Sequence, residues 1–272
     1  MAESSGAPVL EVADLRKQFG QLVAVDGVSF ALLPGRSLAI VGESGAGKTT
    51  IARMIVGLER PTSGTITACE HDRSRPPRSA RDRRRRGREV QIVFQDPYTS
   101  LDPRQNAEAT IDEVLRLHHG WPAERRRARV TELTGLVGLD ARQSRALPRS
   151  LSGGLRQRVA IDRALAAQPA VLILDESVAS LDVSIQAQVL NLLADIRDET
   201  NVSYVLISHD LAVVRQLTDE TLVLHRGTVV ERGPTARILD HPEHPCTQRL
   251  RASVPAPGWK PARQERPEHQ GR

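Results

Sequence analysis

A glycine-rich octapeptide places the tightest constraint on how this chain can fold. Residues 42–49 read Gly-Glu-Ser-Gly-Ala-Gly-Lys-Thr, which fits the pattern G-x-x-x-x-G-K-[S/T] at every fixed position. An apolar run, residues 37–41, precedes the octapeptide, and residues 51–58 carry apolar side chains at helical spacing. The glycines are therefore expected at a strand-to-helix turn, where backbone N–H groups can converge on phosphate oxygens. This context favours a phosphate cradle over a chance glycine-rich turn.

The side chains of the octapeptide suit the same chemistry. Lys48 can reach the β- and γ-phosphates of a nucleotide, and the Thr49 hydroxyl can ligate Mg²⁺. The helix N-terminus adds its partial positive charge. The predicted phosphate-binding residues are Gly42, Glu43, Ser44, Gly45, Ala46, Gly47, Lys48, Thr49 and Thr50.

Length and composition indicate a cytoplasmic protein with a sizeable core. A chain of 272 residues suits one large domain, or a core with a subdomain. No apolar run approaches the ~20 residues of a membrane span, and residues 1–5 do not have the pattern of a signal peptide. Cys69 and Cys246 lack metal-ligand spacing, so we expect two free thiols.

The formal net charge of +5 has a local origin. Residues 78–88 contain seven arginines, and no aromatic residue interleaves with them. A solvated, arginine-rich loop is the favoured interpretation. Binding of anionic headgroups or of nucleic acid remains the alternative, although the missing aromatic residues disfavour single-strand binding.

The segments around the octapeptide predict a small β layer and a helical insertion. Residues 9–33 alternate apolar and polar positions, as antiparallel strands do, and Phe19 among them could stack on an adenine ring or lie in the core. Residues 90–94 predict a strand that leaves Gln95 at its end. Residues 106–147 have helical periodicity, which indicates a subdomain inserted between two halves of an α/β core.

A second glycine-rich helix start follows the insertion. Residues 151–158 begin a helix with Ser152 as its cap, and Gly153 and Gly154 lie just inside it. Each glycine there costs about 1 kcal/mol relative to alanine. A close approach of the backbone to another group explains this cost better than an ordinary cap does.

Carboxylates and a histidine follow two further predicted strands. The apolar run 171–174 ends in Asp175 and Glu176, as expected of a buried parallel strand whose carboxyl end faces a site. Residues 203–207 predict another core strand, and His209 follows it at the same edge. Residues 221–231 predict a hairpin. Regular periodicity ends after residue 233, and residues 255–272 are expected to be disordered.

These motifs occur in an order that resembles the ATP-binding cassette (ABC) ATPases over residues 10–233. The sequence Leu-Ser-Gly-Gly at 151–154, shortly before an apolar strand and Asp-Glu, is the most specific of them. The resemblance implies an α/β fold, namely a RecA-like P-loop NTPase core with an antiparallel β subdomain and an inserted α-helical subdomain. The expected divisions are 1–95 (β subdomain and first half of the core), 96–158 (helical subdomain), 159–233 (second half of the core) and 234–272 (tail).

The resemblance also implies a role for each matching position. ATP and Mg²⁺ are the implied cofactors. Phe19 would stack on the adenine, and the octapeptide would bind the phosphates and Mg²⁺. Gln95 would sense Mg²⁺ and the attacking water, Asp175 would bind Mg²⁺ through water, and Glu176 would be the general base. His209 would contact the γ-phosphate, whereas Ser152, Gly153 and Gly154 would contact a nucleotide on another subunit. Residues 179–182 correspond to the D-loop. A head-to-tail dimer follows from these roles.

Two positions depart from the family pattern. Leu155 stands where glutamine is usual, and Ser177-Val178 replaces Pro-Thr after the catalytic glutamate. Neither change removes a group assigned to the chemistry. A neutral hydrogen bond contributes about 1 kcal/mol, so Leu155 should weaken a composite site by less than roughly tenfold. We therefore expect the partner cassette to be a different chain with a complete signature.

Two segments narrow the resemblance to the dipeptide, oligopeptide and nickel importer subfamily. They are residues 93–103, Val-Phe-Gln-Asp-Pro-Tyr-Thr-Ser-Leu-Asp-Pro, and residues 241–248, where Cys246 replaces the usual tyrosine. The implied function is to energise such an importer. Its implied partners are a second cassette, two membrane permease subunits that dock near residues 95–112, and, indirectly, an extracytoplasmic solute-binding protein. The chain would then lie at the cytoplasmic face of the membrane. The alternative is a soluble ABC ATPase that serves a carbon–phosphorus-bond-cleaving complex, translation or nucleic acid.

Overall fold

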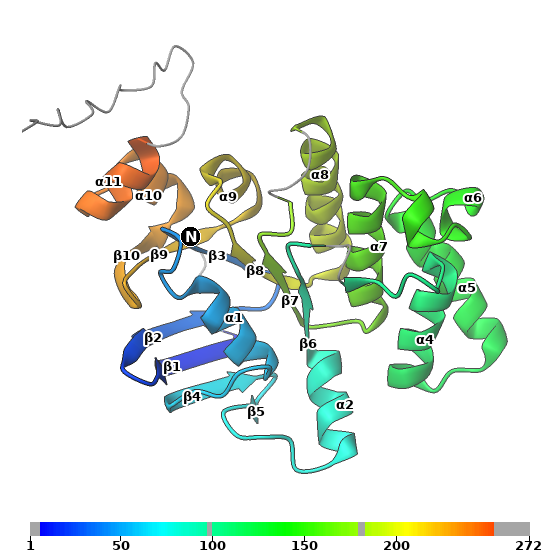
Figure 1. The fold of residues 1–272 in the computed structure, drawn as a ribbon, viewed down its shortest axis with the longest axis horizontal. Coiled ribbons are helices and arrows are strands. Elements are labelled where there is room, and N and C mark those ends of the chain that lie inside the picture. Colours follow the sequence, from blue (N-terminus) through cyan, green and yellow to red (C-terminus); the bar gives the residue numbers. More distant parts are fainter. Residues whose placement is uncertain (1–5, 97–99, 179–182, 253–272) are drawn as a thin grey trace, which may run out of the picture.

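The computed structural model describes residues 6–96, 100–178 and 183–252, and it has an α/β architecture with two β-sheets (Figure 1). The central sheet has six strands in the order β10-β9-β3-β8-β7-β6. All neighbouring pairs are parallel except the β9–β10 hairpin, which confirms the hairpin predicted at residues 221–231. The strands are β3 (Ser37–Gly42), β6 (Val90–Val93), β7 (Val171–Asp175), β8 (Ser203–Ile207), β9 (Glu220–His225) and β10 (Thr228–Pro234).

The second sheet is antiparallel and has the strand order β2-β1-β4-β5. It confirms the small β layer predicted near the N-terminus. Its strands are β1 (Leu10–Phe19), β2 (Leu22–Leu32), β4 (Ser63–Ala68) and β5 (His71–Asp72).

The two faces of the central sheet are covered by different elements. Alternate residues of β3 illustrate this: Leu38 and Ile40 pack with α1 (Lys48–Val56) and the antiparallel sheet, whereas Ala39 and Val41 belong to the cluster on the other face. The second face carries α7 (Gly153–Ala166), α8 (Val183–Thr200) and α9 (Leu211–Leu217). Thus α1, which begins in the octapeptide, and α7, which begins with the second glycine pair, lie on opposite faces of the central sheet.

A group of helices extends from the second face, as predicted for residues 106–147. It contains α4 (Ala107–His119), α5 (Ala123–Leu136), α6 (Ala141–Ser144) and a 3₁₀ turn (Pro148–Ser150), and α4 and α5 pack against α7. The expected division at residue 158 falls inside α7, which continues to Ala166.

The expectation of an arginine-rich loop was wrong. The arginine-rich residues 78–88 do not form a loop, because most of them lie in α2 (Ala80–Glu89). Ser79 caps this helix, Asp82 pairs with Arg85 and Arg86 at helical spacing, and arginine is itself a good helix former. After residue 233 the chain forms α10 (Thr235–Asp240) and α11 (Pro245–Ala252).

Two segments named in the sequence analysis lie outside the described residues. They are the D-loop, residues 179–182, and residues 255–272, which were expected to be disordered. Within those that are described, no helix is both long enough and apolar enough for a membrane span. Cys69 and Cys246 are free thiols, as predicted.

Candidate nucleotide site

Four parallel strands bring the predicted site residues to one edge of the central sheet. β3, β6, β7 and β8 run in the same direction, so their carboxyl ends meet there. The octapeptide begins at the end of β3, and Gln95 follows β6. Asp175 ends β7, Glu176 follows it, and His209 follows β8. Ligands of open α/β sheets bind at this edge.

The backbone of the octapeptide requires glycine at the two points where it is most crowded. Gly42 and Gly47 both have positive φ, 155° and 103°. A Cβ atom at Gly47 would lie 2.4 Å from the Ala24 carbonyl oxygen, and one at Gly42 would lie 2.3 Å from that of Leu224. Both contacts are with backbone, so the loop cannot relax around a larger residue.

The N-terminus of α1 is open to an anion. Its cap, Gly47, has no side chain and satisfies none of the first N–H groups of the helix. By contrast, side-chain caps satisfy N–H groups at the starts of α2, α4, α6, α7 and α9. The first turn of α1 also carries no acidic residue. Free N–H groups and the helix dipole together favour the binding of a phosphate group at this end.

Lys48 is held across the mouth of the loop. Its ammonium group donates to the carbonyl oxygens of Gly42 and Glu43, both at 2.9 Å, and the residue is only 6% exposed. Burial lowers the pKa of Lys48, and the nearby Glu176 and Asp175 carboxylates oppose this shift. A phosphate group would replace these carbonyl contacts with charge-assisted hydrogen bonds.

Thr49 and Asp175 meet between the loop and β7. The Thr49 hydroxyl donates to the Asp175 carboxylate at 3.3 Å. Burial raises the pKa of Asp175, while the Thr49 hydrogen bond lowers it and Glu176 raises it further. A cation at this point would stabilise the ionised carboxylate.

Glu176 and His209 face each other beyond the ends of β7 and β8. His209 Nδ1 lies 3.5 Å from Glu176 Oε1, and 60% of the His209 side chain is exposed. Glu176 has a φ of 48°, a left-handed conformation that is unusual for a residue with a side chain, and its N–H donates to the Ile207 carbonyl at 2.9 Å. Such strained residues concentrate at functional sites.

Gln95 and Phe19 lie at the periphery of this group. Gln95 is two residues past β6, and its side chain is exposed. Phe19 is 44% exposed at the end of β1, with Lys17 Nζ 4.6 Å from the ring centroid. The sequence left open whether Phe19 stacks on an adenine ring or lies in the core. Its exposure excludes a core position, and its ring is accessible for stacking.

The two glycines at the start of α7, Gly153 and Gly154, differ in how closely other atoms approach them. A Cβ atom at Gly154 would lie 2.4 Å from Cγ2 of Ile185, so the approach inferred from the sequence is to α8 of the same chain. Nothing lies within 4 Å of a Cβ atom at Gly153. Ser152 caps α7 through the N–H of Leu155 at 3.3 Å. The Leu155 side chain packs against the core cluster of the second face, which explains how an apolar residue is tolerated there.

The sequence analysis missed the residues that support the octapeptide from outside. The Gly227 N–H donates to the Ala46 carbonyl at 3.1 Å, and the Asp26 N–H donates to the Gly227 carbonyl at 2.8 Å. The β9–β10 turn and β2 therefore brace the phosphate loop. The hairpin signal at Gly227 was visible in the sequence, but its contact with a loop far away in the chain was not.

Comparisons with known proteins identify the family of this chain. Residues 25–179 match the family model described as ABC transporter. The chain is 43% identical over 235 residues to the dipeptide transport ATP-binding protein DppF of Haemophilus influenzae, which covers 86% of this chain and 71% of that protein. It is 42% identical over 258 residues to DppF of Escherichia coli K12, which covers 91% of this chain and 77% of that protein.

Solved structures show the same fold. The ATP-binding cassette MJ0796, solved as a dimer with ADP and Pi, has a TM-score of 0.74 and 26% identity, over 83% of this chain and 98% of that one. The cassette cbiO1 of Clostridium perfringens, part of the transporter complex cbiONQ, has a TM-score of 0.76 and 26% identity, over 86% of this chain and 91% of that one. The predicted resemblance and fold class are thus confirmed, and the chain belongs to the ABC transporter family.

Proposed function

We propose that this chain is the ATP-binding and ATP-hydrolysing subunit that energises an importer of peptides, nickel or related small solutes. The observation that carries the proposal is the meeting of Lys48, the Thr49–Asp175 pair and Glu176 at an uncapped helix N-terminus. The importer assignment rests on the relatives, which are dipeptide and oligopeptide transport ATP-binding proteins. The same relatives favour it over a soluble ABC ATPase.

Mg²⁺ fits the oxygen donors of this site. The Thr49 hydroxyl and the Asp175 carboxylate already point at each other, and Mg²⁺ is commonly held by one or two protein oxygens together with phosphate and water. Across the described residues no cluster of three or more His, Cys, Asp or Glu side chains could hold a metal alone. When bound, Mg²⁺ would neutralise phosphate charge.

The chain's own residues would then act as follows. Lys48 and the free N–H groups of α1 hold the β- and γ-phosphates, and Glu176 takes a proton from the attacking water. His209, which faces Glu176, contacts the γ-phosphate, and Gln95 senses the lytic water and Mg²⁺. Phe19 offers its exposed ring to the adenine.

We further propose a head-to-tail dimer with a different cassette. The N-terminus of α7 lies on the face of the sheet opposite α1, which supports a contact of Ser152 and Gly153 with a nucleotide on another subunit rather than on their own. The open space at Gly153 leaves room for that approach. The dimeric MJ0796 structure supports such an arrangement. Leu155 favours a partner that carries a complete signature.

The proposed assembly contains two membrane permease subunits, which would dock on the helical subdomain near residues 95–112 and keep the chain at the cytoplasmic face of the membrane. An extracytoplasmic solute-binding protein would contribute indirectly. The complex containing cbiO1 supports an assembly of this kind. Nucleic acid is not among the proposed partners.

Isolation of the assembly tests this proposal. We expect tagged Glu176→Gln protein, extracted from membranes with a mild detergent in the presence of ATP and Mg²⁺, to bring down a second cassette and two polytopic membrane proteins. Without nucleotide the second cassette should be recovered less efficiently, because ATP holds the two cassettes together. Recovery of soluble enzymes, ribosomes or nucleic acid instead of membrane proteins would support the soluble alternative.

A further inference from the structure

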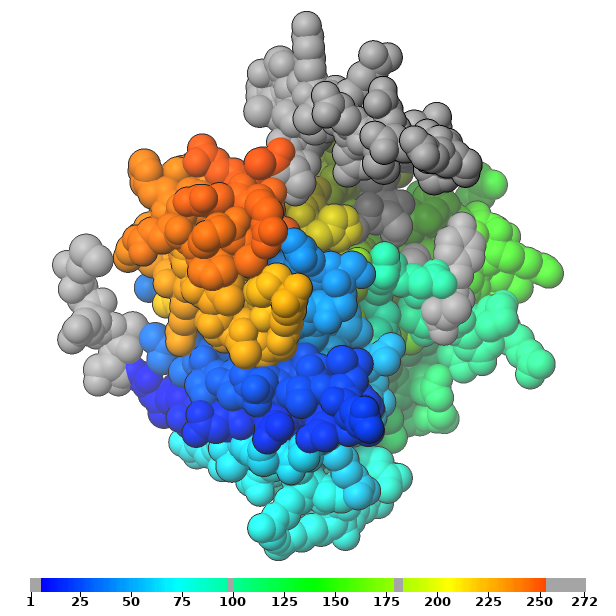
Figure 2. Space-filling model, turned by 60° about the vertical axis from the view of Figure 1, so that its left-hand side comes forward, coloured from blue at the N-terminus to red at the C-terminus, as the bar shows by residue number. Residues whose placement is uncertain are grey.

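The arginine-rich segment of the chain lines a cavity that is open to solvent on the outside of the molecule. The cavity has a volume of about 670 Å³ and lies between the loop after β5 and the first turns of α2. Five arginines and two aspartates line it, and Pro76 is its only lining residue without a polar side chain. Figure 2 shows the surrounding segment, around residues 70–90, at the lower end of the molecule.

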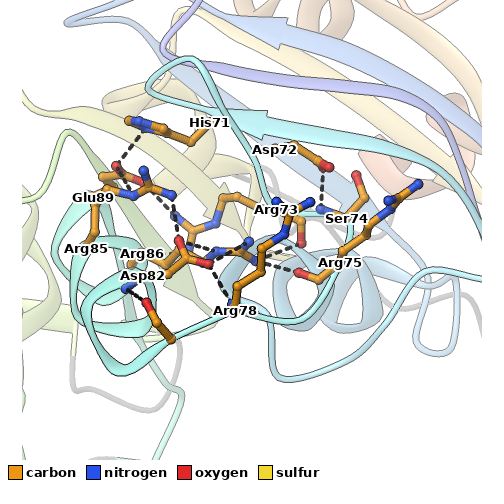
Figure 3. A network of polar contacts seen from close by, with 11 residues as sticks. His71, Asp72, Arg73, Ser74, Arg75, Arg78, Asp82, Arg85, Arg86 and Glu89 are labelled. Atoms are coloured by element: carbon orange, nitrogen blue, oxygen red, sulfur yellow. Dashed lines mark hydrogen bonds and ion pairs between the residues drawn. The ribbon is translucent and has the colours of Figure 1, made fainter.

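Two of the five arginines form the framework of this cavity. Arg86 donates to the Arg75 carbonyl at 2.6 Å and lies 3.2 Å from the Asp82 carboxylate (Figure 3). Asp82 also accepts the N–H of Arg78 at 3.0 Å and pairs with Arg85. The Arg78 N–H, followed by the Arg86 and Arg85 guanidinium groups, holds the pKa of Asp82 below its ordinary value. The loop is therefore fastened to the helix by side chains whose own charges are largely compensated.

Contacts of Asp72 and of the buried Arg73 side chain also hold the loop after β5 in place. The Arg73 side chain is almost fully buried, donates to the Arg86 carbonyl at 3.0 Å and lies 3.7 Å from Glu89. Asp72 accepts the N–H of Ser74 at 2.8 Å. The cavity wall is thus built by specific contacts rather than by a flexible surface loop.

The other three arginines are available for a ligand. Arg75, Arg78 and Arg81 are exposed and line the cavity, and their guanidinium groups form no hydrogen bond or ion pair with the described residues. They come from two segments, the loop and the first turn of α2, so they can approach one ligand from two sides. Clustered guanidinium groups match phosphate oxygens through paired hydrogen bonds.

The lining also limits the chemistry of the ligand. No aromatic side chain lines the cavity for stacking on a base, and Pro76 is the only apolar side chain that lines it. Recognition must therefore rest on charge. The volume lies within the roughly 300–1,000 Å³ of small-molecule sites, which leaves room for more than one phosphate group.

The cavity is remote from the nucleotide site. α2 ends at Glu89 and leads directly into the amino end of β6, whereas Gln95 follows the carboxyl end of that strand. The cavity and the phosphate loop therefore lie at opposite edges of the parallel sheet. We propose that this cavity is a second anion site, separate from the nucleotide site, that binds a ligand with two or more phosphate groups.

Such a ligand could be a free polyphosphate or a lipid headgroup, and two titrations separate these sources. Tripolyphosphate and vesicles of phosphatidylcholine with or without cardiolipin would be titrated against the full chain carrying Lys48→Ala, so that the phosphate loop does not bind the probe. The test protein carries Arg75→Gln, Arg78→Gln and Arg81→Gln. Its control carries Arg84→Gln, Arg88→Gln and Arg116→Gln, which removes the same charge from exposed positions that do not line the cavity.

We expect the Lys48→Ala parent and the control in the same background to bind one or both probes with strong salt dependence, and the test protein to bind roughly tenfold or more weakly. Binding of tripolyphosphate identifies a free anion, and binding of cardiolipin vesicles alone identifies a headgroup. Equal binding by test and control proteins, or no binding by any protein, would overturn the proposal. So would tight nucleic-acid binding that depends on these three arginines without binding of either probe. Thermal unfolding of both variants shows whether they are folded.

Discussion

Replacement of Glu176 with glutamine is expected to lower the rate of ATP turnover by roughly 10²- to 10⁴-fold while ATP binding is retained. Glutamine has nearly the same shape but cannot accept the proton of the attacking water. The side chain lies at the carboxyl end of β7, beside His209 and outside the phosphate loop, so its loss leaves the loop intact. Phosphate release measures turnover, and equilibrium titration with ATP and Mg²⁺ measures binding.

Two further variants complete this test. Lys48→Ala should lose ATP binding itself, because the variant lacks the buried ammonium group and its contacts with the loop. Glu199→Gln, at an exposed position near the end of α8, removes the same charge away from the site and should behave like the wild type. Near-normal turnover by Glu176→Gln would exclude Glu176 as the base.

The second large effect concerns stability rather than activity. Asp162→Ala is expected to raise the free energy of unfolding by ~1–3 kcal/mol. Asp162 is 0% exposed on α7, and neither carboxylate oxygen has a hydrogen-bond partner among the described residues. Arg129 is a charged group near it, but Arg129 pairs with Glu132. Alanine removes an unsatisfied polar group and is the best helix former.

The gain from Asp162→Ala should depend on pH. Burial raises the pKa of Asp162 well above its ordinary value in the folded protein. Below a pH of about 3.9, the ordinary pKa of an aspartate, the Asp162 carboxyl is protonated in both the folded and the unfolded state. Its ionisation then has no effect on the free energy of unfolding. As the pH rises toward the raised folded pKa, the unfolded state releases its proton more readily, so the wild type loses stability. The difference between variant and wild type should therefore grow from mildly acidic to neutral pH.

Urea unfolding at mildly acidic and at neutral pH measures this difference. Asp195→Ala, on the exposed side of α8, is the matched control and should change stability by only a few tenths of a kcal/mol. A loss of stability in Asp162→Ala at neutral pH would mean that the carboxylate has a favourable partner in solution.

The sequence predicted where the candidate site residues lie in the sheet, because they follow strands with clear patterns. The octapeptide, Asp175 and His209 each end or follow a parallel strand, and parallel strands bring their carboxyl ends to one edge. Contacts between distant segments were not predictable in this way. Nothing in the local pattern indicates that Gly227 braces Ala46, or that Gly154 faces Ile185.

Charge and burial account for the remaining differences. The arginines of α2 suggested a solvated loop because their number dominated the composition, yet Asp82 pairs with two of them at helical spacing and stabilises a helix. Asp162 did carry a signal, since it lies three residues from both Val159 and Leu165, on the apolar stripe of its helix. A carboxylate in such a stripe is expected to be buried, and this one is.

ATP-driven solute uptake tests the central claim most directly. The isolated assembly would be placed in vesicles with its cassettes facing inward and with ATP and Mg²⁺ enclosed. Accumulation of a labelled dipeptide would be followed after the dipeptide and the solute-binding protein are added outside. The account predicts uptake that depends on ATP, is lost with Glu176→Gln in this chain and is retained with Glu199→Gln. ATP hydrolysis without uptake of dipeptide, of other small peptides or of nickel would contradict it.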